Sequence, residues 1–293
     1  MGDIHREIIF GTEWIDMLYG EGGQDVIYGF EGDDRIGGGN NSDRIFGDAG
    51  DDIIWAGDVG TLGDRSASNP TGTVSEESDT RNATGNGDLA SGGSGNDRLI
   101  GTEYVDNFFG GPGHDIIEGG RGADVLYGGE GNDYLAARAN PNSDGDLSNN
   151  EIWGGPGDDY IEITGTNSTG MNDLHGDEGN DIIIGGYGAD DIYGGDGDDN
   201  IDGRNGDDEI WGGAGDDILK GGENDQGSFF QDVIHGGSGD DLIYGGTDSS
   251  LDGAQAGVVD FKYIYGDEGD DTIYGSTNTD FQYIWGGEGD DTI

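Results

Sequence analysis

The sequence is built on a nine-residue repeat that recurs along almost its whole length. Residues 110–118 (GGPGHDIIE) are followed by residues 119–127 (GGRGADVLY), and both fit the pattern GGxGxDxUx, in which U is a large aliphatic residue. Units in this register number 26, and position eight is Ile or Leu in all of them except at Ala90 and Phe108. A short fixed period restricts the chain to a solenoid in which each repeat packs on its neighbours.

Each unit predicts a Gly-rich turn followed by a short strand. Positions one to six are rich in Gly and Asp, which favour turns, and positions seven to nine read x-Ile-x. Because side chains alternate along a strand, the position-eight side chain points inward. Two units then complete one coil, and about 13 coils stacked ~4.8 Å apart give an all-β rod on the order of 60 Å long. Asn or Asp at position five (Asn96, Asn132, Asp158 and Asp198) is expected to tolerate a positive φ.

This repeat resembles the calcium-binding nonapeptide repeat of the RTX (repeats-in-toxin, hemolysin-type) family, and the resemblance covers nearly the whole chain. The resemblance implies a right-handed parallel β-roll, a β-solenoid with two repeats per coil. It also implies that calcium ions lie between the turns of successive coils, held by the Asp at position six and by backbone carbonyls of the turn. Calcium, with several ions per chain, is therefore the expected cofactor.

The charge of the chain favours the same kind of partner. The sequence has 64 Asp and Glu against 11 Lys and Arg, a formal net charge of −53, and only 31% of its residues are hydrophobic. Such a chain repels nucleic acid and anionic lipid, and a thin aliphatic core should not fold against this charge without counter-ions. Oxygen ligands favour calcium over softer metals, and the binding energy of calcium then becomes folding energy.

The sequence contains no sign of catalysis or of a membrane span. It has no Cys, its 4 His are far apart, and no HExxH, GxSxG or P-loop spacing occurs. We therefore expect that the chain is not an enzyme. No run approaches the roughly 20 apolar residues of a membrane helix, so we expect no membrane insertion by this segment.

The insertions between repeats distinguish the two edges of the expected rod. Uninterrupted runs contain 6, 6, 2, 6, 2, 2 and 2 units, and because all these numbers are even, every insertion should emerge from the same edge. On the other edge, here called the regular edge, position six is Asp in all 13 turns. We predict that these residues form a continuous row of calcium ligands: Asp16, Asp34, Asp52, Asp97, Asp115, Asp133, Asp159, Asp181, Asp199, Asp217, Asp241, Asp271 and Asp291.

The edge that carries the insertions, here called the inserted edge, is less uniform. Its position-six residues are Glu7, Asp25, Asp43, Asp88, Asp106, Asp124, Asn150, Asn172, Asp190, Asp208, Asp232, Lys262 and Gln282. Calcium is expected in a patchy row, at the pairs Asp25/Asp43, Asp106/Asp124 and Asp190/Asp208. The positive charge of Lys262 at the ligand position argues against a site there.

We expect a single β-roll over residues 1–293, as a fragment of a longer array. The largest polar insertion spans about 57–82, and smaller ones lie near 137–144, 163–166, 221–226, 245–256 and 275–276. Residues 140–151 also resemble an EF-hand loop, a separate calcium site with the ligands Asn140, Asn142, Asp144, Asp146 and Glu151. Asn replaces the usual Asp at the first position of that loop, and flanking helices do not fit between strands, so an acidic turn-rich insertion is the alternative.

Position nine follows the inward residue and should face outward. On the strands that follow the inserted edge, this position is aromatic in 10 of 13 units. Aromatic rings that stack and stabilise neighbouring strands explain this stripe most simply. A contact face for a glycan, for self-association or for a neighbouring domain is the alternative.

These observations predict a calcium-binding structural module of a secreted protein. The resemblance implies type I export followed by folding on calcium binding, and hence an extracellular or cell-surface location. One alternative is an adhesin or surface-layer module that binds a glycan or a partner through the aromatic stripe. Another is an accessory domain of an extracellular enzyme whose catalytic part lies outside this sequence.

Overall fold

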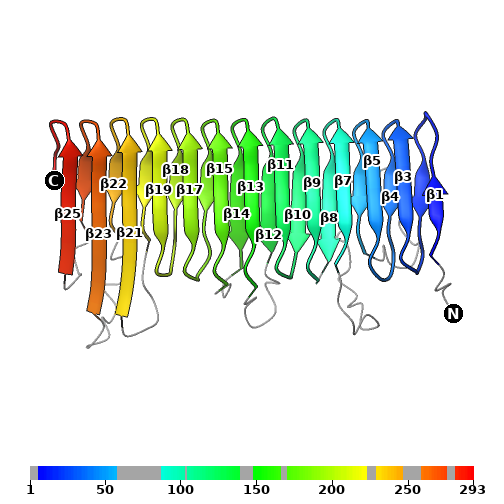
Figure 1. Cartoon of the computed structure of the whole chain (residues 1–293), viewed down its shortest axis with the longest axis horizontal. Coiled ribbons are helices and arrows are strands. Elements are labelled where there is room, and N and C mark those ends of the chain that lie inside the picture. Colours follow the sequence, from blue (N-terminus) through cyan, green and yellow to red (C-terminus); the bar gives the residue numbers. More distant parts are fainter. Residues whose placement is uncertain are drawn as a thin grey trace.

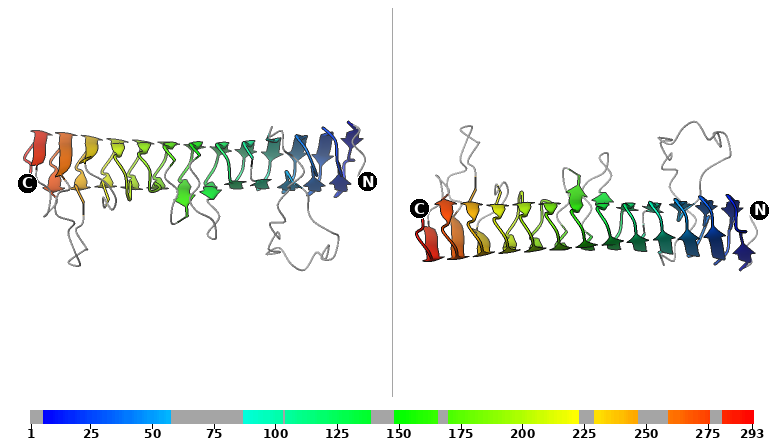
Figure 2. Two further views of the ribbon diagram at one scale, coloured as in Figure 1. Left: turned by 90° about the horizontal axis from the view of Figure 1, so that it is seen from below. Right: turned by 90° about the horizontal axis from the view of Figure 1, so that it is seen from above.

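The computed structural model is an all-β rod of 25 parallel strands in two sheets (Figure 1). It describes residues 6–57, 87–102, 104–138, 148–165, 170–222, 229–246, 259–275 and 281–293. The two sheets lie as facing layers along the rod (Figure 2), and the chain passes from one to the other at every turn. The predicted parallel β-roll, with two repeats per coil, is confirmed.

Odd-numbered strands form a sheet of 13 strands, here called sheet A, and even-numbered strands form a sheet of 12, here called sheet B. Sheet A contains β1 (Ile8–Phe10), β3 (Val26–Glu31), β5 (Arg44–Ala49), β7 (Leu89–Ser94), β9 (Asn107–Pro112), β11 (Val125–Glu130), β13 (Glu151–Pro156), β15 (Asp173–Glu178), β17 (Asp191–Asp196), β19 (Glu209–Ala214), β21 (Phe229–Ser238), β23 (Val259–Glu268) and β25 (Phe281–Glu288). Sheet B contains β2 (Met17–Tyr19), β4 (Arg35–Gly37), β6 (Ile53–Trp55), β8 (Arg98–Thr102), β10 (Ile116–Gly120), β12 (Tyr134–Arg138), β14 (Tyr160–Thr164), β16 (Ile182–Ile184), β18 (Asn200–Asp202), β20 (Ile218–Lys220), β22 (Leu242–Tyr244) and β24 (Thr272–Tyr274).

The core consists mainly of two rows of position-eight side chains between the sheets, joined by Ala56, Ala137 and Ile163. Strands pair so that equivalent repeat positions lie side by side, as in Leu126 beside Ile152. Position-eight residues from Ile27 to Ile264 are fully buried, which confirms that this position points inward. The two exceptions to Ile and Leu are direct neighbours: Ala90 pairs with Phe108, and both are fully buried. The small and large side chains therefore fill one layer of the core together.

Glycine at position one is required by close contacts. An ideal Cβ on Gly128 would lie 2.5 Å from Oδ2 of Asp133 and 2.5 Å from the carbonyl oxygen of Gly154 on the next coil. The same clash with the position-six side chain of its own turn recurs at position-one glycines on both edges. The absence of a side chain at position one therefore leaves space for the carboxylate at position six of the same turn.

Positive φ angles occur at positions two and four of the turn. Gly fills most of these places, but Asp48, Asp177 and Asp267 at position two also have φ between 73° and 78°. The expectation of a positive φ at position five was wrong for Asn96, Asn132, Asp158 and Asp198, which are not among the positive-φ residues. Position five instead has a hydrogen-bonding role that is described below.

The aromatic stripe is a stack of rings on the outer face of sheet A. Eight rings stack in one uninterrupted column, with centroids 4.5–6.2 Å apart and planes within 9° of parallel. The column consists of Phe109, Tyr127, Trp153, His175, Tyr193, Trp211, His235 and Tyr265. Because the ring faces cover one another, this geometry favours the interpretation that the stripe stabilises neighbouring strands.

In the sequence, six of the longer stretches outside the described residues follow a strand of sheet B and precede a strand of sheet A. They lie between β6 and β7, β12 and β13, β14 and β15, β20 and β21, β22 and β23, and β24 and β25. All therefore belong to the inserted edge, and the regular edge is described without interruption. No helix among the described residues is long and apolar enough to cross a membrane.

The position-one contacts predict that Gly128→Ala destabilises the rod. The new Cβ would have to displace Asp133 or the neighbouring coil, so we expect a loss of about 1–3 kcal/mol in the free energy of unfolding. Denaturant unfolding at fixed calcium concentration measures this loss. Glu130→Ala, which truncates an exposed side chain in the same turn, is the control and should change stability by less than about 0.5 kcal/mol. Equal stability of the two variants would contradict the account of position one.

Candidate functional site

The regular edge carries a row of buried carboxylates. Each position-six Asp from Asp16 to Asp271 immediately precedes a strand of sheet B, at the end of the turn that comes from sheet A, and Asp291 lies in the equivalent turn after β25. From Asp34 to Asp271 these side chains are at most 3% exposed, and only Asp16 and Asp291 in the outermost turns are more open. Full burial of so many acids is unusual, because an ionised carboxylate is strongly disfavoured away from water unless it is paired.

One oxygen of each carboxylate is satisfied by the neighbouring coil. The backbone N–H of each Asp donates to Oδ1 of the next Asp along the row, for example from Asp115 to Asp133 at 2.7 Å. Twelve such hydrogen bonds of 2.7–3.1 Å connect all 13 regular-edge Asp residues from Asp16 to Asp291. The spacing of the coils therefore fixes the orientation of every carboxylate.

The second oxygen, Oδ2, has no hydrogen-bond donor in eleven of these thirteen residues. They are Asp34, Asp52, Asp97, Asp115, Asp133, Asp159, Asp181, Asp199, Asp217, Asp241 and Asp271. Asp16 differs because its Oδ2 accepts from the backbone N–H and the hydroxyl of Thr12, at 2.6 and 2.8 Å. A buried oxygen without a donor costs about 1–3 kcal/mol, and more if it is charged, so this row needs a compensating group.

The space beside these oxygens is lined by more oxygen. An ideal Cβ on Gly110 would lie 2.2 Å from Oδ2 of Asp115 and 2.5 Å from the carbonyl oxygen of Gly128, and Gly194 has the same surroundings on Asp199 and Gly212. No three Asp, Glu or His side chains within the described residues converge to hold a metal ion. A cation on this edge would therefore depend on the Asp residues together with turn carbonyls, a donor set that suits calcium.

The carboxyls of the row are raised in pKa. Burial is the main cause that raises the pKa of these carboxyls, to about 7 for Asp97 and Asp115 and to about 8 for Asp159 and Asp217. The hydrogen bond from the preceding backbone N–H opposes this rise, whereas neighbouring carboxylates such as Asp181 beside Asp159 add to it. Near neutral pH, a proton or a cation would therefore neutralise the buried carboxylates of this row.

A second ladder of side chains runs beside the first on the regular edge. Position-five residues from Asp33 to Asp290 are joined by eleven hydrogen bonds of 2.7–3.2 Å. These bonds run the opposite way, because each N–H donates to the side chain of the preceding coil. His114 takes part by accepting at Nδ1 from the N–H of Asn132 at 2.8 Å. Sequence reasoning missed this role, although the recurrence of Asp and Asn at position five was its signal.

The inserted edge repeats the Oδ1 ladder, but at Asp106, Asp190 and Asp232 a protein donor reaches Oδ2. Ten hydrogen bonds of 2.6–3.2 Å connect its position-six residues from Glu7 to Asp232. Oδ2 of Asp106 accepts from the backbone N–H and the hydroxyl of Thr102, and Oδ2 of Asp190 accepts from the N–H of Gly186.

The predicted pairs on this edge consequently differ from one another. Asp25 and Asp43 are adjacent, and both have an Oδ2 without a donor, as in the regular edge. In the pair Asp106/Asp124, Oδ2 of Asp106 is satisfied by Thr102. Asp208 in the last pair keeps an Oδ2 without a donor, whereas its partner is satisfied. The Gly-Thr-Glu sequences at residues 11–13 and 101–103 were the available signal for the Thr donors.

The EF-hand-like ligands are not brought together in the described part of the structure. Asn140, Asn142, Asp144 and Asp146 lie outside the described residues. Glu151, the fifth of that set, is the exposed first residue of β13 and pairs with Val125 and Asp173 on the neighbouring strands. The separate EF-hand site stays a prediction.

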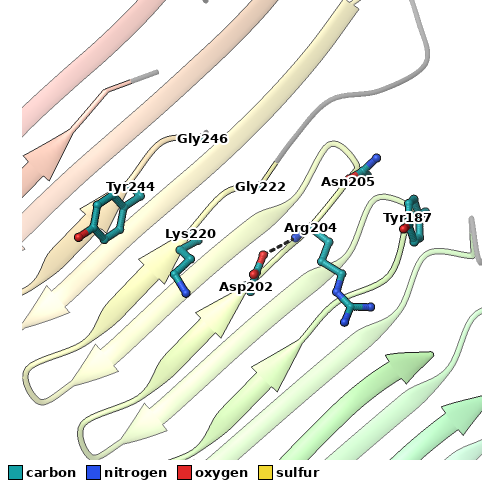
Figure 3. A pocket seen from close by; sticks show the side chains of 8 residues that line it. All are labelled: Tyr187, Asp202, Arg204, Asn205, Lys220, Gly222, Tyr244 and Gly246. Atoms are coloured by element: carbon teal, nitrogen blue, oxygen red, sulfur yellow. Dashed lines mark hydrogen bonds between the residues drawn. The ribbon is translucent and has the colours of Figure 1, made fainter. Parts of the chain in front are cut away.

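A hollow of about 370 Å³ lies at the end of the strands β18, β20 and β22 (Figure 3). Its lining consists of Tyr187, Asp202, Arg204, Asn205, Lys220, Gly222, Tyr244 and Gly246. This lining holds no Ser, Cys or His that could act as a nucleophile with its base, and Oδ1 of Asp202 accepts a hydrogen bond from the backbone N–H of Arg204. The hollow therefore has no arrangement typical of a hydrolytic site.

Comparison with known proteins identifies the repeat. A family profile described as the RTX calcium-binding nonapeptide repeat (4 copies) matches in many copies along the chain. The matched residues are 10–45, 37–58, 82–103, 91–125, 100–135, 143–162, 166–201, 193–225, 226–250, 263–282 and 283–293. No curated protein matches the sequence. The chain belongs to the RTX calcium-binding nonapeptide repeat family.

Proposed function

We propose that the chain is a calcium-binding structural module of a secreted protein, and that the regular edge is its principal calcium site. The observation that carries this proposal is the row of eleven buried Oδ2 atoms without a donor. Each would be satisfied by a cation between successive turns, held by the position-six Asp residues and by turn carbonyls. When bound, calcium supplies the positive charge that this edge lacks.

The donor set and its geometry favour calcium over other cations. Carboxylate and carbonyl oxygens are hard ligands, which calcium binds in flexible arrangements of six to eight, whereas magnesium demands a near-ideal octahedron and keeps its waters. The chain has no Cys to attract softer metals. With a formal charge of −53, the chain also attracts divalent cations along the length of the rod.

Binding and folding are coupled in this proposal. The carboxylate row exists only when successive coils are stacked, because each Asp is oriented by the N–H of its neighbour. The unfolded chain has no such row, so the calcium binding energy contributes directly to folding. Extracellular calcium modules often bind at ~10⁻⁴–10⁻³ M, which would leave the chain unfolded during type I export and folded outside the cell.

A role as a stalk or spacer fits the rod better than recognition through the aromatic stripe. The rings of the stripe stack on one another with planes within 9° of parallel, so their faces are not available to a sugar ring along most of the column. The edges of the rings remain the only outward surface there. This favours a structural module over a glycan-binding adhesin.

Calcium should convert the chain from disorder to β structure. In excess chelator we expect the circular dichroism of a disordered chain, and a cooperative gain of β signal as calcium is titrated in. Magnesium at the same concentration should leave the chain largely unfolded, because its coordination demands are not met here. A fully β-rich chain in chelator would contradict the proposal.

The ligand role of the regular edge predicts that one substitution weakens folding in calcium. Asp159→Asn keeps the Oδ1 acceptor for Asp133 but replaces Oδ2 by an N–H donor. We expect a loss of about 1–3 kcal/mol of stability in saturating calcium and a higher midpoint calcium concentration for folding, because one ligand oxygen is lost. Thermal unfolding in saturating calcium measures the loss, and a calcium titration followed by circular dichroism measures the midpoint.

Asp158→Asn is the matched control. Asp158 is the adjacent exposed residue in the position-five ladder, where Asn132 and Asn180 already occur naturally. This control should change neither the stability in saturating calcium nor the calcium midpoint appreciably. If both variants behave alike, Asp159 is not a ligand.

Protons should compete with calcium for the regular edge. Burial raises the pKa of its carboxyls to about 6 for Asp181, about 7 for Asp199 and about 8 for Asp217, against ~3.9 in an unfolded chain. The folded metal-free chain therefore binds more protons than the unfolded chain, and its stability falls as the pH rises from about 4 to about 8.

The calcium requirement for folding should follow the same trend. Because a proton on a raised carboxyl stabilises the folded chain in place of a cation, less calcium is needed at low pH, and the midpoint calcium concentration for folding should rise between about pH 5.5 and about pH 8. Calcium titrations followed by circular dichroism at several pH values measure this midpoint. A midpoint that does not change over that range would show that the raised carboxyls take no part in binding.

A further inference from the structure

Lys262 is a buried ammonium at the ligand position of the inserted edge. Its side chain is 1% exposed, and it lies at position six directly beside Asp232, which is fully buried on the neighbouring strand of sheet A. The Nζ atom of Lys262 forms an ion pair with Oδ2 of Asp232. A Lys in such a place is rarely found without a specific acid partner, because burial of an unpaired ammonium is strongly unfavourable.

The atom that Lys262 contacts is the atom that lacks a donor on the regular edge. Asp232 uses Oδ1 to accept the backbone N–H of Asp208, as every ladder residue does with its own neighbour. Its Oδ2 then faces Nζ, whereas Oδ2 of Asp217 or Asp241 on the regular edge faces no donor at all. Asp232 therefore has the same Oδ1 arrangement as the regular-edge residues, with the ammonium of Lys262 at its Oδ2.

We propose that the ammonium of Lys262 takes the place of a calcium ion at Asp232, as a counter-ion built into the chain. This inference rests on the proposed calcium-binding function of the regular edge. The final position-six residues of the inserted edge are Asp232, Lys262 and Gln282, whose formal charges of −1, +1 and 0 sum to zero. This end of the edge is neutral at any calcium concentration, whereas the regular edge beside it holds an Asp at every turn.

The last of these three residues also occupies the carboxylate place without a charge. An ideal Cβ on Gly275 would lie 2.2 Å from Oε1 of Gln282, and the equivalent distance from Gly212 to Oδ2 of Asp217 is 2.2 Å. The amide oxygen of Gln282 thus lies where a carboxylate oxygen lies in the regular turns. No cation is required to balance it.

The middle of the inserted edge uses protein donors in a comparable way. Asn150 and Asn172 replace Asp at position six, and both are buried. The Nδ2 of Asn150 donates to Oδ1 of Asn172 at 2.9 Å, and the Nδ2 of Asn172 donates to Oδ1 of Asp190 at 2.7 Å. At Asn150 and Asn172, as at Lys262, an N–H donor therefore stands at position six, where the regular turns have a carboxylate oxygen.

The test compares calcium uptake by the full chain and by two variants with the same charge change. Lys262→Asp restores a carboxylate next to Asp232, and Lys220→Asp places one at the outer face of sheet B. Equilibrium dialysis in saturating calcium, followed by metal analysis, gives the number of ions per chain. We expect Lys262→Asp to bind one more calcium ion than the unaltered chain, and Lys220→Asp to bind the same number.

The outcomes separate this inference from the proposed function. If the unaltered chain binds calcium but Lys262→Asp binds no additional ion, or does not fold in saturating calcium, the inference is overturned and the proposed function stands. If the unaltered chain binds no calcium, both are overturned. An additional ion in both variants would also overturn the inference, because the gain would then follow net charge and not the place of Lys262.

A second variant tests the counter-ion role without a new ligand. Lys262→Met removes the charge and keeps the length of the side chain, so we expect a lower Tm in saturating calcium than for Lys220→Met. Adding Asp232→Asn to Lys262→Met should recover part of that loss, because it removes the carboxylate that was left without its partner. Equal Tm values for Lys262→Met and Lys220→Met would show that the ion pair does not hold this edge together.

Discussion

The fold depends on how buried carboxylates are neutralised. Most coils contribute only two inward side chains to the core, yet nearly every coil buries an Asp at the regular edge as well. The backbone satisfies one oxygen of that Asp and leaves the other facing a space lined by carbonyl oxygens. Stacking therefore aligns like charges at the spacing of adjacent strands. This repulsion must be removed before the thin aliphatic core can hold the coils together.

The two edges solve this problem by different means. The regular edge repeats one arrangement without interruption, so that a single kind of ion can serve every turn. The inserted edge instead uses Thr102, the N–H of Gly186, the amides of Asn150 and Asn172, and the ammonium of Lys262. The described part of the rod therefore has one uniform edge, for which we propose calcium, and one variable edge.

Much of the fold followed from the period of the sequence. Position eight is inward, insertions share one edge and the aromatic stripe faces outward, because each of these depends only on the place of a residue in the repeat. The position-five ladder and the Lys262–Asp232 ion pair did not follow, because they join residues 18 to 45 positions apart and depend on which atom faces the next coil. The same limit applies to the Oδ2 atoms, since a sequence shows an Asp but not which of its oxygens has a donor.

The central claim is that cations lie beside the Oδ2 atoms of the regular edge. A crystal structure of the full chain grown in calcium, with diffraction data collected at long wavelength, would locate calcium through its anomalous scattering. We expect anomalous peaks between successive turns from Asp34 to Asp271, each in contact with Oδ2 oxygens and turn carbonyls. The same turns folded with no anomalous peak, and with their Oδ2 atoms bonded to water or protein donors, would contradict the account.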